Sequence, residues 1–377
     1  MTSYLHSGST DVDVDTVREA LEHRDPFPGT AGFAGEVDGK LVRDVLGRVP
    51  LFLERDLDWE TSNPLAPADW AFSPAELEEP ELVSAGTVVD SDGPNRVWRL
   101  PDLAPEPEHD RALEAVDRAI RTAIDAVRSE NADTAVAFSG GVDSALVAEL
   151  LDAPLYVAGF PDSHDVEAAR TAADAMGREL TVVELTHDDL ERAVPQVARA
   201  TGRTNAMDVQ IALPLYLTGE RAAADGFDRL AVGQGADELF GGYEKVVRLD
   251  HRVEAETVRG AVREQILTLA DQLPRDVLAL EAAGVDPVAP LLHDAVVEAA
   301  LALPTELLVT DEARKYGFRR VAAEYLPETV VHREKKAVQY GSLAARELDR
   351  LARQAGYKRR MDDHVTKYVR SLLESSS

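Results

Sequence analysis

The sequence predicts an α/β protein: a doubly wound parallel sheet with C-terminal helices, preceded by a small, mostly β region. Short apolar runs alternate with amphipathic helical patterns between residues 110 and 233, which is typical of parallel strands covered by helices. Upstream of residue 101 the apolar runs are short and turn residues separate them. From about residue 250 onward the pattern is almost wholly helical.

The first region is predicted to contain a helix and a β-hairpin. Residues 11–24 carry an apolar stripe at helical spacing, with Asp15 or Thr16 as the N-cap. In residues 32–43, Asp38-Gly39 separates two β-prone runs, and this dipeptide favours the tight turn of a hairpin. A Pro- and acid-rich segment without periodicity follows at residues 101–110. We expect it to link two domains, residues 1–108 and 109–377.

The second region is predicted to open with a helix over residues 110–129, because its apolar side chains recur at helical spacing. Strands and helices then alternate, which requires crossover connections and so a parallel sheet. The predicted strands are 134–138, 155–160, 180–185 and 229–233, and the predicted helices are 145–151, 166–177, 188–201 and 209–225.

Composition excludes several classes of function. The chain has no cysteine, so disulfides, thiolate metal sites and thiol nucleophiles are all excluded. It has no run of about 18 apolar residues, the length that a membrane-spanning helix needs. Its first residues show neither the basic nor the apolar part of a signal peptide. We therefore expect a cytoplasmic protein that does not bind membranes.

The chain is strongly acidic, with a net charge of −29 and a pI near 4.6. Such a surface repels the phosphates of nucleic acids, so no nucleic-acid partner is expected. Lysine is scarce and most cations are arginines. An acidic, lysine-poor composition suits a salt-rich cytoplasm, where screening removes the self-repulsion, and we expect a halophilic source.

A glycine-rich segment follows the predicted strand 134–138 and precedes a helix. It consists of Ser139, Gly140, Gly141, Val142, Asp143 and Ser144. Glycines let the backbone approach a ligand closely, and the N-terminus of the next helix offers free N–H groups and the positive end of its dipole. The segment lacks the lysine of a Walker A loop. We predict that it binds a chain of phosphates, as in ATP.

Two carboxylates beside phosphate indicate a metal. Asp143 lies in the phosphate loop, and Asp237 lies in a second glycine-rich segment, residues 233–243, which follows the strand 229–233. Parallel strands end at one edge of the sheet, where open α/β folds bind their ligands. A carboxylate next to phosphate is repulsive unless a cation lies between them, so we predict Mg²⁺ on Asp143.

These segments resemble two related groups of enzymes. Residues 139–144 resemble the Ser-Gly-Gly-x-Asp-Ser loop of the ATP-pyrophosphatase superfamily. Residues 233–243, which include Gly233 and Gly235, resemble the corresponding loop of the asparagine synthetase family. Gly159 and Phe160, with the segment 165–169, resemble the part of that family that follows the second strand. The resemblance implies that ATP binds here, with adenine near residues 157–160. It also implies that Asp237 is the second ligand of the predicted Mg²⁺.

The resemblance extends toward the C-terminus. The segment Arg333-Glu334-Lys335 is similar to the family's Arg-x-Lys, whose lysine contacts the phosphates during adenylation. This implies a catalytic role for Lys335, supported by Arg333, with Lys336 as the alternative if the register shifts by one. The family's glutamate-containing motif before Pro-Phe-Leu-Asp is altered, however. Alignment on Pro290 places Asp286 in the glutamate's position as the third catalytic candidate, with Glu281 as another.

Residues 32–100 resemble the latter half of the glutaminase domain with which asparagine synthetases begin. The resemblance implies a truncated remnant without its catalytic cysteine. Removal of Met1 would expose Thr2 as a nucleophile, but the resemblance leaves no glutamine pocket for it. Ammonia is then expected from solution or from a separate glutaminase.

The resemblance implies an AMP-forming carbon–nitrogen ligase that makes asparagine from aspartate, ATP and ammonia through a β-aspartyl-adenylate. Two alternatives stay open: a ligase of the same fold acting on another carboxylate, as β-lactam synthetases do, and a non-catalytic nucleotide-binding subunit of a glutaminase. A tRNA-modifying enzyme of the superfamily fits poorly with the missing cysteine and the acidic surface. A homodimer stays open as well.

The charge analysis makes one prediction about stability. The free energy of unfolding is expected to rise with KCl concentration from dilute buffer into the molar range, because salt screens the repulsion among the acidic groups. Thermal unfolding followed by circular dichroism at increasing KCl concentration measures this. A midpoint already maximal in dilute buffer would contradict the halophilic interpretation.

Overall fold

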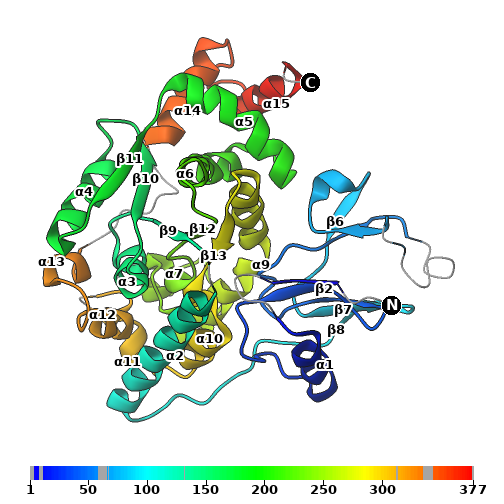
Figure 1. The fold of residues 1–377 in the computed structure, drawn as a ribbon, viewed down its shortest axis with the longest axis vertical. Helices are drawn as coiled ribbons and strands as arrows, with labels where there is room; N and C mark the ends of the chain where they lie inside the picture. The colour runs from blue at the N-terminus through cyan, green and yellow to red at the C-terminus, as the bar shows by residue number, and fades with distance from the viewer. Residues whose placement is uncertain are drawn as a thin grey trace.

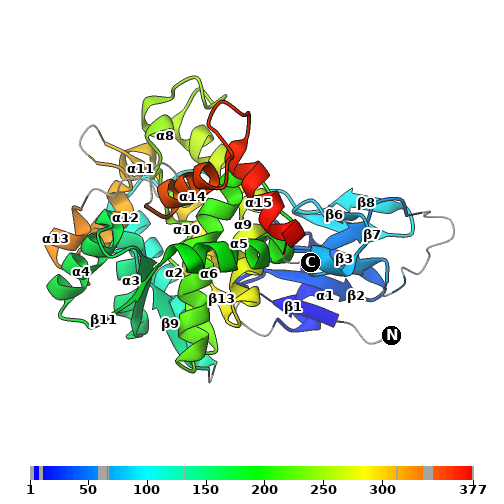
Figure 2. The ribbon, with the colours of Figure 1, turned by 90° about the horizontal axis from the view of Figure 1, so that it is seen from above.

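The computed structural model describes residues 4–7, 12–57, 66, 68–130, 132–310, 313–333 and 343–375. A small β-rich region lies to one side of a larger α/β region, and the chain passes from the first to the second through an extended segment before residue 109 (Figures 1 and 2). None of the helices in these ranges is long and apolar enough to cross a membrane.

The α/β region is built on one parallel sheet, which confirms the predicted fold class. Its strands lie in the order β11-β10-β9-β12-β13. They comprise β9 (Thr134–Ala137), β10 (Leu155–Gly159), β11 (Leu180–Glu184), β12 (Arg229–Ala231) and β13 (Asp286–Val288). The strand order reverses between β9 and β12, so the loops that follow these two strands leave in opposite directions and open a crevice at the carboxyl edge. The fifth strand was not predicted, because three residues that include Pro287 carry little strand signal.

The two faces of the sheet are buried in different clusters, as the alternation of side chains along each strand requires. Val136, Leu155 and Ala231 face a core shared with α2 (His109–Ser129), α3 (Val142–Leu151) and α4 (His164–Met176). Ala135, Tyr156 and Leu230 face a core shared with α6 (Ala206–Ala224) and α9 (Val258–Ala282). Helix α2 forms because its apolar stripe, buried in the first core, repeats at helical spacing.

The remaining helices cover the sheet and its edges. The first group is α5 (His187–Thr201), α7 (Ala236–Leu239), α8 (Glu244–Arg248), α10 (Asp294–Leu301) and α11 (Thr305–Leu308). The second is α12 (Tyr316–Ala322), α13 (Glu328–Val331), α14 (Leu343–Gln354) and α15 (His364–Ser375). Helices α14 and α15 pack on α5 and α6 through a separate apolar cluster that contains Leu348 and Val369 (Figure 1). Two short 3₁₀ turns occur at Pro74–Glu76 and Pro290–Leu292.

The N-terminal region contains two small antiparallel sheets. The larger has the order β1-β2-β3-β7-β8, with β1 (Tyr4–Ser7), β2 (Phe33–Val37), β3 (Lys40–Arg43), β7 (Thr87–Asp90) and β8 (Gly93–Arg96). The smaller has the order β5-β4-β6, with β4 (Phe52–Glu54), β5 (Trp70–Ala71) and β6 (Pro80–Leu82). The predicted hairpin is confirmed: Val37 faces Lys40, and Asp38 and Gly39 both have positive φ, as the turn requires.

Helix α1 (Val14–His23) is shorter than predicted and has a different N-cap. The side chain of Asp13, rather than Asp15 or Thr16, caps it by accepting a hydrogen bond from the Asp15 amide at 3.2 Å. Asp13 is extended, with ψ of 135°, whereas Asp15 and Thr16 are helical. A cap must lie just outside the helix, which excludes both predicted residues.

A buried ion network joins the N-terminal region to the α/β region. The Arg48 guanidinium lies 2.9 Å from Asp44 and 2.8 Å from Asp294, and it donates to the Leu292 carbonyl at 2.8 Å. The Asp294 carboxylate also accepts hydrogen bonds from the amide of Thr30 at 2.7 Å and from its hydroxyl at 3.1 Å. Since buried charges need paired partners, this network fixes the position of α10 against the N-terminal region.

The segment predicted to be a linker is held along its length. Arg263 donates to the carbonyls of Leu100 and Pro101, and Arg259 donates to that of Leu103. The amide of Glu106 then donates to the Ala302 carbonyl at 2.9 Å. Backbone groups that would otherwise face solvent are therefore tied to α9 and the end of α10. A division into domains near residue 108 remains a proposal.

Replacing Arg48 by Met is expected to lower the free energy of unfolding by roughly 3–5 kcal/mol, because it leaves the buried Asp44 and Asp294 carboxylates without their shared cation. Chemical denaturation in molar KCl measures this loss. Arg55→Met is the control, since the Arg55 side chain is 60% exposed and lies 3.9 Å from Glu79. Equal losses in the two variants would contradict a structural role for the buried network.

Candidate active site

The predicted phosphate loop lies between the carboxyl end of β9 and the first turn of α3. Gly140 has φ of +70°, and a Cβ there would lie 2.6 Å from the Ala168 carbonyl, so only glycine fits. Gly141 is the N-cap of α3 and makes no side-chain capping bond. The first-turn amides of α3, which include that of Val142, thus have no side-chain cap, the arrangement that suits an anion at a helix N-terminus.

Hydroxyl groups hold the loop in shape. The Ser144 hydroxyl lies 3.2 Å from the Ser139 amide and 3.2 Å from the Ser139 hydroxyl, and it donates to the Gly141 carbonyl at 3.2 Å. These bonds tie the two ends of the loop together. They fix its curvature without any ligand.

The second glycine-rich segment meets the phosphate loop directly. A Cβ on Gly233 would lie 2.6 Å from the Ser144 amide nitrogen, which is closer than real side chains come. Gly235 is the N-cap of α7, and Asp237 lies in the first turn of that helix. The parallel register, which aligns β12 with β9, brings both segments to one edge as predicted.

The structure brings Asp143 and Asp237 together on one ammonium group. The Nζ of Lys315 lies 2.7 and 2.8 Å from the two carboxylate oxygens of Asp143, and 2.8 Å from Oδ1 of Asp237. Burial by itself lowers the pKa of Lys315, but the two carboxylates outweigh it and raise the pKa above its ordinary value. The lysine therefore stays charged.

Sequence reasoning gave Lys315 no role. The residue just precedes α12, and its backbone lies in the left-handed region with φ of 55°. This conformation is uncommon outside glycine, and it aims the side chain at the two aspartates. The segment 315–319 belongs to the family resemblance, but the sequence could not pair Lys315 with its partners, because they come from two distant loops.

A buried acid lies next to this ion cluster. Burial raises the pKa of Glu238, and the nearby carboxylates of Asp237 and Asp143 add to that effect, whereas a hydrogen bond donated by the Tyr243 hydroxyl opposes it. Burial and the Glu238 carboxylate raise the pKa of Tyr243 as well, so its hydroxyl remains a donor. Protonation of Glu238 is thus easier than that of an exposed glutamate.

The two aspartates suit a magnesium ion held jointly with phosphate. Their oxygens converge on a single point, which the Lys315 ammonium marks. Among the described residues, no group of three or more His, Cys, Asp or Glu side chains has a metal-binding arrangement. A complete protein cage is therefore not formed there. Mg²⁺ is commonly bound by one or two carboxylates, with water and substrate phosphates as the other ligands.

The structure also brings Arg333 to the phosphate loop. Its Nη1 donates to the Ala168 carbonyl, the group that lies against Gly140. Arg319 donates to the carbonyls of Val331 and Arg333 and so holds the chain that leads there from α13. Lys335 and Lys336 lie outside the described residues, and a catalytic role for Lys335 stays a prediction.

Gly159 and Phe160 lie at the carboxyl edge, one strand away from the phosphate loop. Gly159 ends β10, and the ring of Phe160 lies 5.8 Å from that of His187 at the start of α5. Since β10 pairs with β9, these residues lie beside the loop. Their contact with adenine remains a prediction.

Asp286 lies away from the ion cluster, and a catalytic role for it stays a prediction. Asp286 begins β13 and aligns with Arg229, the first residue of β12, at the amino edge of the sheet. Asp143 and Asp237 lie beyond the opposite ends of their strands. Alignment on Pro290 identified Asp286 by its position in the sequence. It did not show that this residue lies at the first position of β13. Glu281, the alternative, ends α9 and contacts His6 instead.

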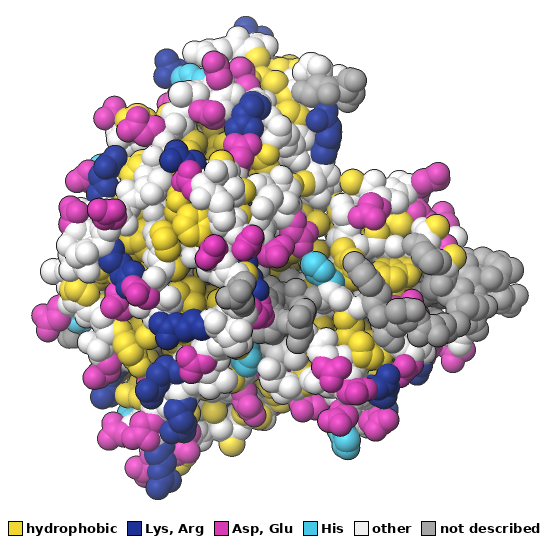
Figure 3. Space-filling view, in the orientation of Figure 1, with side chains coloured by type: hydrophobic (Ala, Val, Ile, Leu, Met, Phe, Trp, Pro, Cys, Tyr) yellow, Lys and Arg dark blue, Asp and Glu magenta, His cyan; other side chains and the backbone are white. Residues whose placement is uncertain are grey.

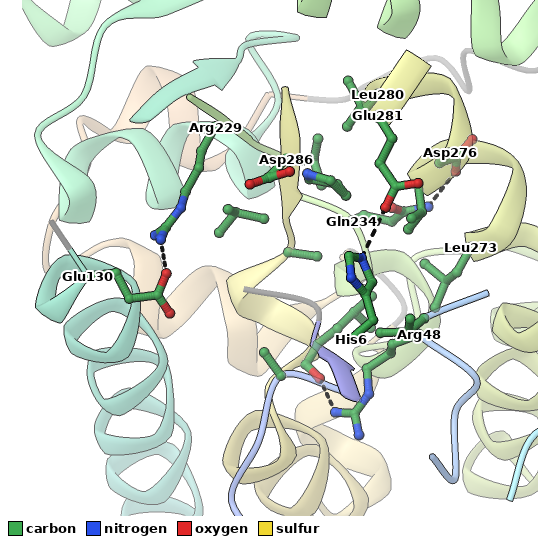
Figure 4. A pocket seen from close by; sticks show the side chains of 18 of the residues that line it. His6, Arg48, Glu130, Arg229, Gln234, Leu273, Asp276, Leu280, Glu281 and Asp286 are labelled. Atoms are coloured by element: carbon green, nitrogen blue, oxygen red, sulfur yellow. Dashed lines mark hydrogen bonds and ion pairs between the residues drawn. The ribbon is translucent and has the colours of Figure 1, made fainter. Parts of the chain in front are cut away.

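A cavity of about 270 Å³ lies between the N-terminal region and the edge of the sheet, and both Glu281 and Asp286 line it (Figure 4). His6 lies 3.3 Å from Glu281, and Gln234 donates to Asp276 at 2.6 Å across another part of the lining. Because Gln234 belongs to the segment that carries Asp237, the cavity reaches the second loop from the side of the N-terminal region. Sequence reasoning missed it, since its walls come from distant parts of the chain.

Known proteins are similar in sequence to the part of the chain that holds these segments. A sequence model of the family described as asparagine synthase matches residues 115–279 and 252–375. A putative glutamine-hydrolyzing asparagine synthetase from Methanocaldococcus jannaschii is 28% identical over 307 residues, which cover 71% of this chain and 57% of that protein. The glutamine-hydrolyzing asparagine synthetase B of Escherichia coli is 25% identical over 185 residues, which cover 48% and 33%. The chain thus spans a third to a little over half of these relatives.

A solved structure is also similar. It is a U34-tRNA thiolase from Methanococcus maripaludis, which covers 71% of this chain and 80% of its own at 13% identity. The TM-score is 0.29. That value carries no argument about fold or function, so the fold stands on the sheet topology described above.

The His6–Glu281 contact predicts a pH dependence. The hydrogen bond to Glu281 raises the pKa of His6 above its ordinary value, although burial opposes the shift. The resulting stabilisation is complete below the unfolded-state pKa of about 6.5 and is lost as the pH rises through the higher folded-state value. Unfolding midpoints of wild type and Glu281→Gln at fixed KCl are therefore expected to converge as the pH rises above about 6.5. Glu114→Gln, at an exposed position on α2, is the control, and a pH-independent gap for Glu281→Gln would contradict the contact.

Proposed function

The chain belongs to the asparagine synthase family, and from that premise we propose that it is an ATP-dependent, ammonia-using asparagine synthetase that releases AMP and pyrophosphate. The observation that carries the proposal is the convergence of Asp143, Asp237 and Lys315 beside the phosphate loop. A loop for phosphates, two carboxylates for a metal and a buried cation are the parts that adenylation needs.

Each part of the site has a proposed role in the reaction. The backbone of the phosphate loop and the N-terminus of α3 hold the departing pyrophosphate. Asp143 and Asp237 would hold Mg²⁺, which supplies Lewis-acid stabilisation of the phosphate oxygens. Arg333, anchored through Ala168, adds positive charge beside the loop, and Lys335 is proposed to contact the phosphates. Gly159 and Phe160 border the space proposed for adenine.

The reaction balances in two steps. A side-chain carboxylate oxygen of aspartate forms a bond to the α-phosphorus of ATP, and the bond to the β-phosphate bridging oxygen breaks, giving β-aspartyl-adenylate and pyrophosphate. The nitrogen lone pair of ammonia then attacks the acyl carbon, the acyl–oxygen bond breaks, and AMP leaves with its electron pair. One proton of the ammonia is released.

Ammonia is proposed to come from outside the chain. No cysteine is present to hydrolyse glutamine, and the described part of the N-terminal region contains two small sheets, one helix and a 3₁₀ turn. The cavity between that region and the sheet supports the proposal, because it reaches Gln234 in the second loop (Figure 4). A separate glutaminase remains the alternative donor.

Pyrophosphate release in molar KCl, with Mg²⁺ and ATP present and with aspartate and ammonium each present or omitted, tests the proposal. Asparagine and AMP are expected only when both substrates are present, and glutamine is expected not to replace ammonium, because no thiol nucleophile exists. ATP binding without pyrophosphate release would favour a non-catalytic subunit. Release with a different carboxylate would favour the β-lactam-synthetase-like alternative.

Asp143→Asn and Asp237→Asn are each expected to lower kcat/KM by about 100-fold or more, because each removes a proposed ligand of the metal that offsets charge in the transition state. Steady-state kinetics at saturating ammonium measure the loss. Asp125→Asn, on the exposed face of α2, is the matched control and is expected to keep wild-type rates. Full activity of both site variants would overturn the assignment.

A further inference from the structure

The cation at the centre of the site is a lysine, although the other buried cations of the described chain are arginines. Lys315 is 6% exposed, and the buried arginines are Arg43, Arg48 and Arg275. Arginine suits a permanent buried pair, because its planar fork is weakly hydrated and pre-organised. Lysine carries a compact charge on a flexible stem that can swing between partners. The use of lysine here indicates a cation that moves.

The ammonium and a divalent ion cannot share the site. Nζ lies 2.7 and 2.8 Å from the two Asp143 oxygens and 2.8 Å from Asp237 Oδ1, so it fills the point on which the carboxylates converge. Mg²⁺ on these oxygens would lie about 2.0–2.1 Å from each, close to the same point. Like charges at such separations repel strongly where water is largely excluded. One cation has to leave before the other can bind.

Charge balance indicates which partner Lys315 takes next. With the ammonium alone, the two carboxylates and the lysine carry a net charge of −1, and Glu238 lies beside them. A divalent ion alone would balance both carboxylates and leave the displaced ammonium without a partner. A nucleotide that arrives with the metal supplies the missing partner in its phosphate oxygens.

We infer that Lys315 is an exchangeable counter-ion: it neutralises Asp143 and Asp237 while the site is free, and it yields them to a divalent metal only when a nucleotide's phosphates receive its ammonium. This inference rests on the proposed nucleotide site. It makes Lys315 a positioning residue that couples metal binding to nucleotide binding. It also keeps the phosphate loop and the second loop together without a ligand.

Mn²⁺ binding in the absence of nucleotide tests the exchange. Electron paramagnetic resonance of free Mn²⁺, in molar KCl, compares wild type with Lys315→Met, which removes the competing charge. The variant is expected to bind Mn²⁺ at least about tenfold more tightly, because the ion no longer displaces a cation. Lys40→Met, at an exposed position in the N-terminal region, is the control and is expected to match wild type. Equal or weaker binding by Lys315→Met overturns the inference.

Thermal unfolding gives a second readout. Without metal, Lys315→Met removes the ammonium that Asp143 and Asp237 share. The variant is expected to unfold at a lower temperature than wild type, and Mn²⁺ is expected to restore it. If this variant does not fold, Lys315→Gln is measured in its place, since its amide still donates a hydrogen bond but carries no charge. A stability loss that Mn²⁺ leaves unchanged in the folded variant counts against exchange.

A separate titration with a non-hydrolysable ATP analogue distinguishes this inference from the proposed function. In wild type the analogue is expected to increase Mn²⁺ affinity, and in Lys315→Met this increase is expected to be smaller, because the displacement cost is already gone. If the analogue does not bind, the proposed nucleotide site is wrong, but this result does not bear on competition between Lys315 and metal. The nucleotide-free comparison would still decide whether Lys315 competes with metal. An equal increase in both proteins would overturn the coupling.

Discussion

The ammonium of Lys315 is the contact on which the site depends, because it joins three segments that are distant in sequence. Asp143 comes from the loop after β9, Asp237 from the loop after β12, and Lys315 from the chain just before α12. The parallel sheet brings the first two to one edge, and the packing of the C-terminal helices brings the third. Buried charges tolerate few arrangements, so this cluster constrains all three segments at once.

The N-terminal region is attached by the same kind of interaction. Arg48 bridges Asp44 within that region and Asp294 at the start of α10, while Arg259 and Arg263 hold the extended segment before α2. These contacts bury the junction and leave a cavity beside it. A region that has no catalytic cysteine is therefore still part of the structure around the second loop, and in our proposal it shapes the approach of ammonia.

The surface is governed by a different constraint. Acidic side chains are spread over the face shown in Figure 3. Several exposed ion pairs of the described chain join an arginine to a carboxylate. Exposed pairs contribute little individually. The net charge of −29 means that many acidic groups have no cation to pair with, and they repel one another. Salt screens this repulsion, so we propose that the chain works in concentrated salt. The buried pairs are shielded from that salt, which lets the same protein keep a charged centre.

The sequence by itself determined what neighbouring residues decide: the alternation that builds a parallel sheet, the glycine-rich turn at Ser139–Ser144 between a strand and a helix, the hairpin at Asp38-Gly39, and the acidic residues Asp143 and Asp237 in the two glycine-rich segments. Each depends on periodicity or on residues close together in the chain, so local patterns carry the information. Tertiary structure alone decided the position of Lys315 between the two aspartates, the place of Asp286 at the amino edge of the sheet, the Arg48 network and the cavity. Those features pair residues from segments that are distant in the sequence or depend on which end of a strand a residue occupies, and only the folded chain fixes such distances.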